Sequence, residues 1–227
     1  MTPLPPHIVL VHGAWHGEWA WESLLPHLAA AGLSAVAVSL PSSGGDGDLA
    51  TDAEVVRGVL DELDGPAILV GHSYGGIVIS EAATAETVRH LVYVAAYLLP
   101  RGDSLLDALN HTLPYWILVD EPTGVSRVQD AAKRLFGDVP PEVTAAVLPR
   151  LTTQTLSSFR ARQTRAAWAQ IPTTYVVCDQ DRAIPPRSQI AMSRAATHVD
   201  TLHSSHSPFL SQPAKLAGIL AGISAAD

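Results

Sequence analysis

Short apolar runs alternate with amphipathic segments along most of the chain. Runs rich in β-branched residues predict six buried strands, at His7–Val11, Ser34–Ser39, Ala67–Val70, Leu91–Ala95, Thr173–Cys178 and His198–Leu202. Apolar positions at helical spacing predict helices at Glu18–Ala31, Asp52–Leu63 (capped by Thr51), Tyr74–Ala85 and Pro208–Ile223. Buried strands that alternate with helices indicate an α/β fold, with a mainly parallel central sheet flanked by helices on both faces.

The segment Leu98–Ile171 interrupts this alternation, because it contains no convincing strand. Its helical pieces are separated by prolines and lie at Asp103–Leu109, Val125–Phe136, Glu142–Leu148 and Leu156–Trp168. We expect residues 98–171 to form a helical cap inserted between two strands of a core domain made of residues 1–97 and 172–227. Ligands of open α/β sheets bind at the carboxyl ends of the strands, where such a cap would lie.

Composition narrows the classes of protein that fit. A chain of 227 residues with 47% hydrophobic residues can bury a substantial core. Its 14 basic and 22 acidic residues give a formal charge of −8, which argues against nucleic acid or an anionic membrane as partner. The single cysteine, Cys178, excludes an internal disulfide, and the chain shows no basic, apolar leader and no long apolar stretch. We therefore expect a cytoplasmic location.

The stretch GHSYGG, from Gly71 to Gly76, lies between a predicted strand and a predicted helix. This context is typical of a nucleophile elbow, in which the serine adopts a strained backbone conformation and projects its hydroxyl above the sheet edge. The surrounding glycines relieve crowding in so sharp a turn. The alternative is a plain turn in which Ser73 caps the helix, but the combination of strand, serine and helix favours a nucleophile.

A nucleophilic serine needs a base and an acid that orients the base, in the chain order Ser, Asp or Glu, His. The fifth predicted strand runs into a loop with Asp179 and Asp181, and the last strand precedes a loop with His203 and His206. Both loops leave the sheet at the edge where Ser73 lies. Each loop therefore offers two candidates.

Two further features complete the candidate chemistry. The stretch VHGAWHG after the first strand offers the backbone amide of Ala14 as an oxyanion donor, and the amide of Tyr74 offers a second. A rival interpretation takes His12 with His16, or His203 with His206, as metal ligands, but no Cys or acidic cluster completes such a site. The chain also lacks dinucleotide-binding and P-loop motifs. We expect no cofactor and no metal.

The stretches HGAWHGEWAW, GHSYGG, YVVCDQDRAIPP and SSHSPFLSQP resemble the α/β-hydrolase superfamily. They are most similar to the branch that contains plant methyl-ester hydrolases such as methyl salicylate esterases, hydroxynitrile lyases and small bacterial esterase-like proteins. The resemblance extends over most of the chain and is weakest at Leu98–Ile171. It implies the α/β-hydrolase fold with a helical cap.

The resemblance also implies roles for individual residues. Ser73 corresponds to the nucleophile, Asp181 to the acid and His206 to the base, and the oxyanion donors correspond to Ala14 and Tyr74. Loop position favours the same acid and base. Asp181 stands further into its turn than its competitor, and His206 lies just before a proline that favours the start of a helix.

The related lyases carry a threonine where this chain has Gly13 and a lysine where it has Ser207, so ester hydrolysis is favoured over cyanohydrin cleavage. We expect a serine esterase that cleaves a small, mostly apolar carboxylic ester through an acyl-enzyme. Candidate substrate-binding residues are Trp15, Leu98, Tyr115, Trp116 and Phe159. The alternative is a lyase, cyclase, decarboxylase or ligand receptor on the same scaffold. The expected partner is a small-molecule ester, and a homodimer is possible.

Overall fold

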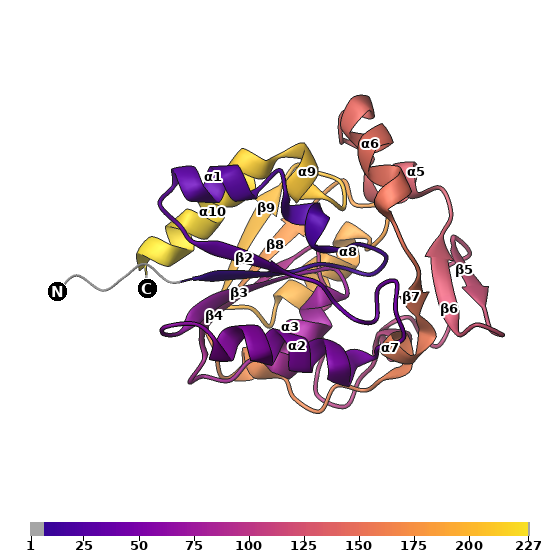
Figure 1. Ribbon diagram of the computed structural model, residues 1–227, viewed down its shortest axis with the longest axis horizontal. Coiled ribbons are helices and arrows are strands. Elements are labelled where there is room, and N and C mark those ends of the chain that lie inside the picture. Colours follow the sequence, from indigo (N-terminus) through magenta and orange to yellow (C-terminus); the bar gives the residue numbers. More distant parts are fainter. Residues whose placement is uncertain (1–6, 227) are drawn as a thin grey trace.

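A parallel six-stranded sheet forms the centre of the molecule. The computed structural model describes residues 7–226, and Figure 1 shows the sheet between two layers of helices. The sheet has the order β2-β1-β3-β4-β8-β9, and its strands are β1 (Ile8–Val11), β2 (Ala35–Val38), β3 (Ala67–His72), β4 (Val88–Val94), β8 (Thr173–Cys178) and β9 (His198–Leu202). All neighbouring pairs are parallel, so the predicted fold class is confirmed.

Alternate residues of each strand face opposite helical layers. In β1, Val9 and Val11 belong to one hydrophobic core with Val56 of α2, whereas Ile8 and Leu10 belong to a second core on the other side of the sheet. Both faces of β1, β3, β4 and β8 are buried, which explains why these four strands appear in the sequence as largely apolar runs, whereas the edge strands β2 and β9 are partly exposed.

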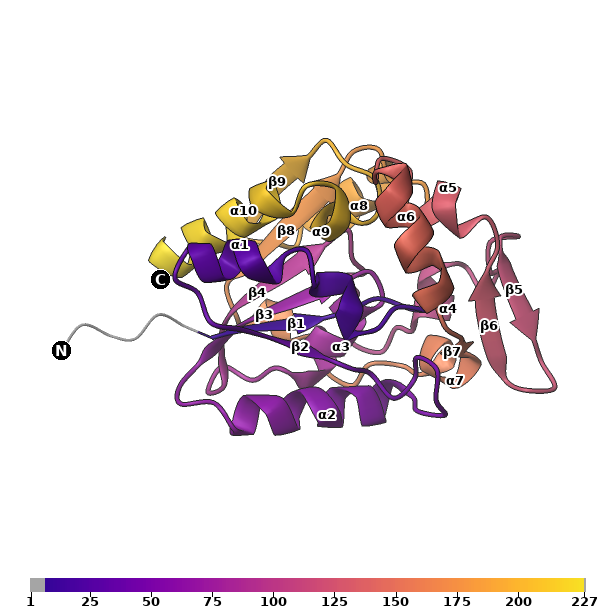
Figure 2. The same cartoon turned by 45° about the horizontal axis from the view of Figure 1, so that its top comes forward.

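The helices form two layers, which Figures 1 and 2 show on opposite faces of the sheet. One layer comprises η1 (Glu18–Trp21), α1 (Leu25–Ala30), α9 (Pro208–Ser211) and α10 (Pro213–Ala226). The other layer comprises α2 (Leu49–Asp61), α3 (Gly75–Ala82) and α8 (Pro186–Ser193). The predicted first and last helices are each divided in two, and a proline stands in the first turn of α1, α9 and α10. Asp48, not Thr51, caps α2, because its carboxylate accepts hydrogen bonds from the Ala50 and Thr51 amides.

The chain between β4 and β8 forms the cap, and here the prediction was partly wrong. It contains an antiparallel three-stranded sheet, β5 (Ile117–Asp120), β6 (Val125–Val128) and β7 (Gln154–Thr155). Its helical elements are short: α4 (Leu105–Ala108), α5 (Ala131–Leu135), α6 (Pro141–Val147), η2 (Leu148–Arg150), α7 (Leu156–Arg160) and η3 (Ala167–Ala169). Part of the predicted helix at Val125–Phe136 is therefore a strand. Gly124, at φ +69°, lies in the turn that joins β5 to β6.

The cap covers the carboxyl edge of the central sheet, at the right of Figures 1 and 2. This placement was expected from the sequence, whereas the division into two domains at the predicted boundaries stays a prediction. Within residues 7–226, no helix has both the length and the apolar character needed to cross a bilayer.

Candidate active site

Ser73 occupies the turn between β3 and α3 in a left-handed backbone conformation, with φ at +54°. A non-glycine residue adopts this conformation only where its surroundings hold it. The Ser73 carbonyl accepts hydrogen bonds from the amides of Gly76 and Tyr97, both at 3.1 Å. The Ser73 amide donates to the carbonyl of Val94 at 3.3 Å. The elbow is thus tied to the strand and loop beside it.

The glycines around Ser73 are required by close backbone contacts. A Cβ atom on Gly71 would lie 2.6 Å from the carbonyl oxygen of Gly75, and one on Gly76 would lie 2.5 Å from that of Tyr97. Both distances are shorter than Cβ contacts in real proteins, and the partners are backbone atoms that cannot move aside. The turn therefore accepts only glycine at these positions.

Three residues with strained backbone conformations lie at the carboxyl edge of the central sheet. Trp15, Ser73 and Ala95 follow β1, β3 and β4, and all three have positive φ angles, of 65°, 54° and 44°. Left-handed non-glycine residues concentrate at functional sites, where the fold over-determines the backbone. Neighbouring strands thus bring three strained turns to one edge, which marks that edge as a candidate site.

Asp181 and His206 form a buried pair at the same edge. The Nδ1 atom of His206 lies 2.7 Å from Oδ2 of Asp181, and the two side chains are 2% and 0% exposed. The Asp181 Oδ1 atom accepts from the amides of Ala183 at 2.7 Å and Ile184 at 3.0 Å. A carboxylate fixed in this way accepts the Nδ1 proton of the imidazole, which leaves Nε2 as an acceptor.

Two residues that the sequence analysis missed hold this pair in place. Gln189 of α8 donates to Asp181 Oδ2 at 2.8 Å and accepts from the Cys178 amide at 2.9 Å. His72, the last residue of β3, donates from Nε2 to the carbonyl of His206 at 2.9 Å. His72 occupies the variable position before Ser73 in the elbow motif. The only sign of its role in the sequence is a polar residue close after a predicted buried strand.

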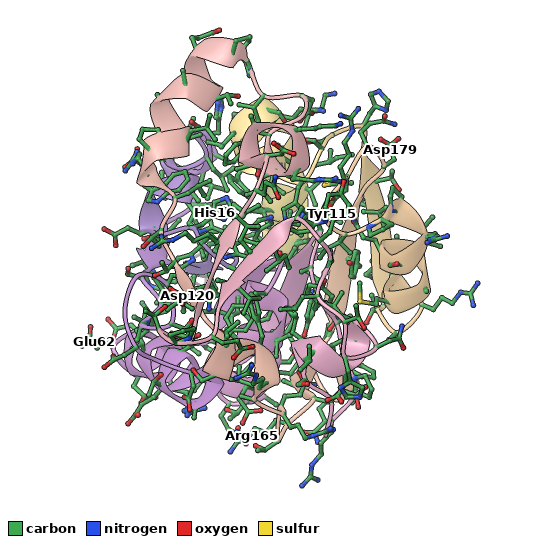
Figure 3. All side chains as sticks on the ribbon, turned by 90° about the vertical axis from the view of Figure 1, so that its right-hand side faces the viewer. His16, Glu62, Tyr115, Asp120, Arg165 and Asp179 are labelled. Carbon is green, nitrogen blue, oxygen red and sulfur yellow. The ribbon has the colours of Figure 1, made fainter. Side chains whose placement is uncertain are left out.

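The competing candidates form a separate, exposed pair. His203 Nδ1 lies 3.0 Å from Asp179 Oδ1, but their side chains are 77% and 39% exposed. Asp179 lies at the margin of the molecule in Figure 3. The structure therefore sorts the two aspartates and two histidines into one buried and one solvated pair.

His12 and His16, the remaining histidines of the rival metal-ligand interpretation, have structural contacts. His12 donates from Nδ1 to the Gly13 carbonyl at 2.9 Å and accepts at Nε2 from the Leu40 amide at 3.1 Å. His16 donates from Nδ1 to the Ala14 carbonyl at 2.8 Å. Burial lowers the pKa of His12 to about 4 and that of His16 to about 3. In residues 7–226, no group of three or more His, Cys, Asp or Glu side chains is arranged to hold a metal.

The two candidate oxyanion donors are the backbone amides of Ala14, in the loop after β1, and of Tyr74, in the elbow itself. Within the described chain, the backbone amides of Ala14 and Tyr74 donate no hydrogen bond. Gly13 packs directly on the serine, since a Cβ atom there would lie 2.7 Å from Cβ of Ser73 and 2.8 Å from Nδ1 of His72. The first loop and the elbow are therefore in close contact.

A buried acid lies behind the elbow. Asp52 of α2 accepts hydrogen bonds from the Ser42 amide at 2.9 Å, the Ser42 hydroxyl at 2.5 Å and the Tyr74 hydroxyl at 2.8 Å. Burial raises the pKa of Asp52, although these hydrogen bonds act in the opposite direction. The sequence analysis placed Asp52 in a helix without assigning it a partner.

Gln154 of the cap continues this polar network to the first loop. Its Nε2 atom donates to the hydroxyls of Ser42 and Ser158, both at 2.7 Å. Its Oε1 atom accepts from the Ser43 hydroxyl at 2.7 Å and from the Trp15 amide at 3.3 Å. All the hydrogen-bonding capacity of the buried amide is used, so cap, elbow and oxyanion loop are connected.

Ser73 and His206 line one small cavity under the cap. About 20 Å³ of it is open to the centre of a water molecule, which is room for about one water. Within the described chain, no hydrogen bond joins the serine hydroxyl to the histidine ring, and such bonds often tighten only when substrate binds. The remaining walls are Ala14, Trp15, Tyr74, Tyr97, Leu105, Leu109, Pro114, Trp116, Ile117, Phe159, Ala183 and Ile184.

The predicted substrate-binding residues divide into two groups. Trp15, Trp116 and Phe159 line the cavity. The ring of Trp15 packs edge-on against the other two, with its centroid 6.0 Å from that of Trp116 and 5.9 Å from that of Phe159. Leu98 is buried in the core but does not line the cavity. Tyr115 is 77% exposed, on the face turned to the viewer in Figure 3. The sequence analysis missed the aliphatic wall, which comes from residues far apart in the chain.

This fold and site define a hydrolase scaffold, and comparison with known proteins agrees. A model of the "Alpha/beta hydrolase family" matches residues 8–219. "Alpha/beta hydrolase nvfD" of Aspergillus novofumigatus is 31% identical over 232 residues, which cover 92% of this chain and 93% of the relative. "Methylesterase 17" of Arabidopsis thaliana is 28% identical, over 95% and 90% of the two chains.

Solved structures agree as well. A pyrethroid hydrolase from Sphingobium faniae superimposes with a TM-score of 0.84 at 25% identity, over 97% of this chain and 98% of that one. The chain belongs to the alpha/beta hydrolase family. The predicted resemblance, fold class and class of enzyme, a hydrolase, are confirmed.

The elbow contacts predict a sharp difference between two glycines. Gly76→Ala places a Cβ atom against the Tyr97 carbonyl, so the turn must shift, and we expect the free energy of unfolding to fall by roughly 1–3 kcal/mol. Gly58→Ala is the matched control, because a Cβ atom in this turn of α2 meets nothing within 4 Å. It should be neutral or stabilising, by up to about 1 kcal/mol. Urea unfolding measures both, and equal stability of the two variants would contradict this account of the elbow.

The buried histidines predict a loss of stability in acid. Between pH 6.5 and about 4, unfolded chains bind protons at His12 and His16 that the native protein does not bind. The free energy of unfolding should therefore fall as the pH falls, by about 1.4 kcal/mol per pH unit for each histidine. The raised pKa of Asp52 contributes with the opposite sign.

A comparison of pH slopes isolates this effect. In His16→Gln, the slope of stability against pH from 6.5 to 4 should be shallower than in the wild type. His27→Gln, at an exposed histidine, should keep the wild-type slope. Unfolding in urea at several pH values provides the slopes. Identical slopes in His16→Gln and the wild type would show that His16 is not buried in its neutral form.

Proposed function

We propose that the protein is a serine esterase that cleaves a small, mostly apolar carboxylic ester through an acyl-enzyme, with Ser73 as nucleophile, His206 as base and Asp181 as orienting acid. The observation that carries this proposal is the buried Asp181–His206 hydrogen bond of 2.7 Å at a cavity that Ser73 also lines. The names of relatives, among them "Methyl jasmonate esterase 1" of Vitis vinifera, support an ester as substrate.

In this mechanism the Ser73 hydroxyl attacks the ester carbonyl while Nε2 of His206 takes its proton. Asp181 keeps the imidazole in the Nδ1-protonated tautomer and stabilises the imidazolium that forms. The imidazolium then protonates the departing alcohol, and the C–O bond to the alcohol breaks. A water molecule, deprotonated by His206, attacks the acyl-enzyme, and the acid leaves as Ser73 regains its proton.

The amides of Ala14 and Tyr74 stabilise the negative oxygen of both tetrahedral intermediates. Neither amide is used elsewhere in the described chain, so both are available to donate. The Asp52–Tyr74 hydrogen bond and the contact of Gln154 with the Trp15 amide hold the two turns in place. Preorganised donors of this kind commonly contribute about 2.7–4 kcal/mol each to transition-state stabilisation.

Hydrolysis is favoured over cyanohydrin cleavage by what surrounds the serine. No Lys or Arg side chain lines the cavity within the described chain. Ser207 is fully buried and does not line it, so it supplies no charge to a leaving cyanide. Gly13 leaves no space for a side chain beside Ser73. A neutral, apolar cavity suits a small ester.

The two Asp–His pairs allow a direct test of this mechanism. Ser73→Ala and His206→Ala should each lower kcat for p-nitrophenyl acetate by about 10³-fold or more, and Asp181→Asn somewhat less. A fluorophosphonate probe should label wild-type protein on the peptide that contains Ser73, and Ser73→Ala should not be labelled.

The exposed pair provides matched controls of the same residue types. His203→Ala and Asp179→Asn should retain most of the activity, because neither side chain lines the cavity that contains Ser73. Loss of activity in His203→Ala with retention in His206→Ala would assign the base to the other loop. Unchanged turnover and labelling in Ser73→Ala would remove the proposed nucleophile.

A second prediction separates hydrolysis from the alternative lyase chemistry. Incubation with mandelonitrile should release cyanide no faster than the buffer does, because the cavity supplies no positive charge to the leaving group. Short aryl acetates and methyl benzoate should be hydrolysed under the same conditions. Cyanide release that depends on Ser73 would assign a lyase instead, and binding of esters without turnover would assign a receptor.

A further inference from the structure

A second, larger hollow opens beside the candidate catalytic cavity. It measures about 630 Å³, against about 20 Å³ for the inner cavity. The two share a wall formed by Tyr97, Leu109, Pro114, Trp116, Ala183 and Ile184. The outer hollow, called the groove below, therefore adjoins the inner cavity across these side chains, and a substrate too long for the inner cavity would extend past them into it.

The groove is positively charged in a protein whose formal charge is −8. Arg134 of α5 and Arg182 of the loop after β8 line it, and no acidic residue does so within the described chain. Neither arginine has a carboxylate partner among residues 7–226. Two uncompensated cations on one groove favour an anionic group of a ligand.

Arg134 is fixed in position by contacts that leave its charge uncompensated. Its guanidinium lies 5.3 Å from the ring centre of Tyr115 and 5.8 Å from that of Trp116. It donates to the Tyr115 hydroxyl and, at 3.5 Å, to the Arg182 carbonyl. Its Nε atom is buried and has no partner within the described chain. The guanidinium is therefore held in place while no carboxylate meets its charge.

The position of Trp116 connects this cation to the reaction. Trp116 lines both hollows and also lies beside the Arg134 guanidinium. A ligand that extends from Ser73 along this ring would reach the guanidinium, whose planar donors match a carboxylate. The reacting ester would lie at Ser73, the apolar part of the ligand would pack along the ring of Trp116, and the groove would provide the charge.

We infer that the esterase prefers substrates that carry a carboxylate at the end remote from the scissile ester, such as half-esters of dicarboxylic acids, and that Arg134 binds this carboxylate with help from Arg182. This inference rests on the proposed ester hydrolysis and adds the substrate class. Tyr115, which does not line the catalytic cavity, acquires a role here through its contacts with Arg134.

The test compares monomethyl esters of linear C5 to C9 dicarboxylic acids with the neutral dimethyl ester of each acid. We expect kcat/KM for the best half-ester to exceed that of its diester by about tenfold or more, chiefly through a lower KM. Arg134→Gln should reduce this ratio by about tenfold, and Arg134→Lys should retain part of it. Arg194→Gln, at an exposed arginine directly after α8 and outside the groove, should keep the wild-type ratio. Added salt should lower the ratio because it screens the partly exposed cations.

A binding experiment keeps the two proposals distinguishable. Hexanedioate should bind Ser73→Ala in calorimetry, and the added Arg134→Gln change should weaken binding about tenfold, whereas added Arg194→Gln should not. If the wild type hydrolyses no ester but hexanedioate binds through Arg134, the esterase proposal fails and the anion site stands. If diesters are hydrolysed at least as well as half-esters and Arg134→Gln changes neither the ratio nor hexanedioate binding, the anion site is overturned and the esterase stands.

Discussion

The left-handed backbone at Ser73 is the constraint on which the rest of the site depends. A residue with a side chain avoids this conformation unless close contacts enforce it. Here Gly71 and Gly76 allow the backbone to approach within distances that a Cβ atom would forbid, and Gly13 brings the first loop against the serine. The same turn leaves the Tyr74 amide at the start of α3 without a hydrogen-bond acceptor in the described chain. The proposed nucleophile and one proposed oxyanion donor thus depend on one backbone geometry.

A buried network of hydrogen bonds holds this strained turn in place. The Tyr74 hydroxyl donates to Asp52, whose second partner, Ser42, also accepts from Gln154 of the cap. Gln154 in turn accepts from the amide of Trp15, which is itself left-handed. A buried network whose members are hydrogen-bonded is rigid, so a shift of the cap would also shift the turns at Trp15 and Tyr74. The cap and the carboxyl edge of the central sheet are therefore expected to move together.

The sequence predicted what depends on local pattern and missed what depends on tertiary contact. All six central strands were predicted, and the clearest are the inner ones, where burial on both faces leaves apolar runs such as Ile8–Val11. The strand Val125–Val128 was taken for a helix because its burial is only partial and its stabilising partner, β5, precedes it across a turn. Gln189 and Gln154 were missed for another reason. A glutamine has no distinctive pattern in a sequence, and only the folded chain shows that it is buried against Asp181 or Trp15.

The two Asp–His pairs illustrate how the fold assigns chemistry to equivalent residue types. Both pairs are close, at 2.7 Å and 3.0 Å, and both lie in the same two loops. In the other pair His203 is 77% exposed, so its contact with the carboxylate is weak and the imidazole is free to turn. The buried pair is held by the Ala183 and Ile184 amides and by Gln189, so the carboxylate cannot leave the imidazole and the imidazole cannot change tautomer. A base needs a fixed orientation more than it needs proximity to an acid, and the loop that turns inward provides it.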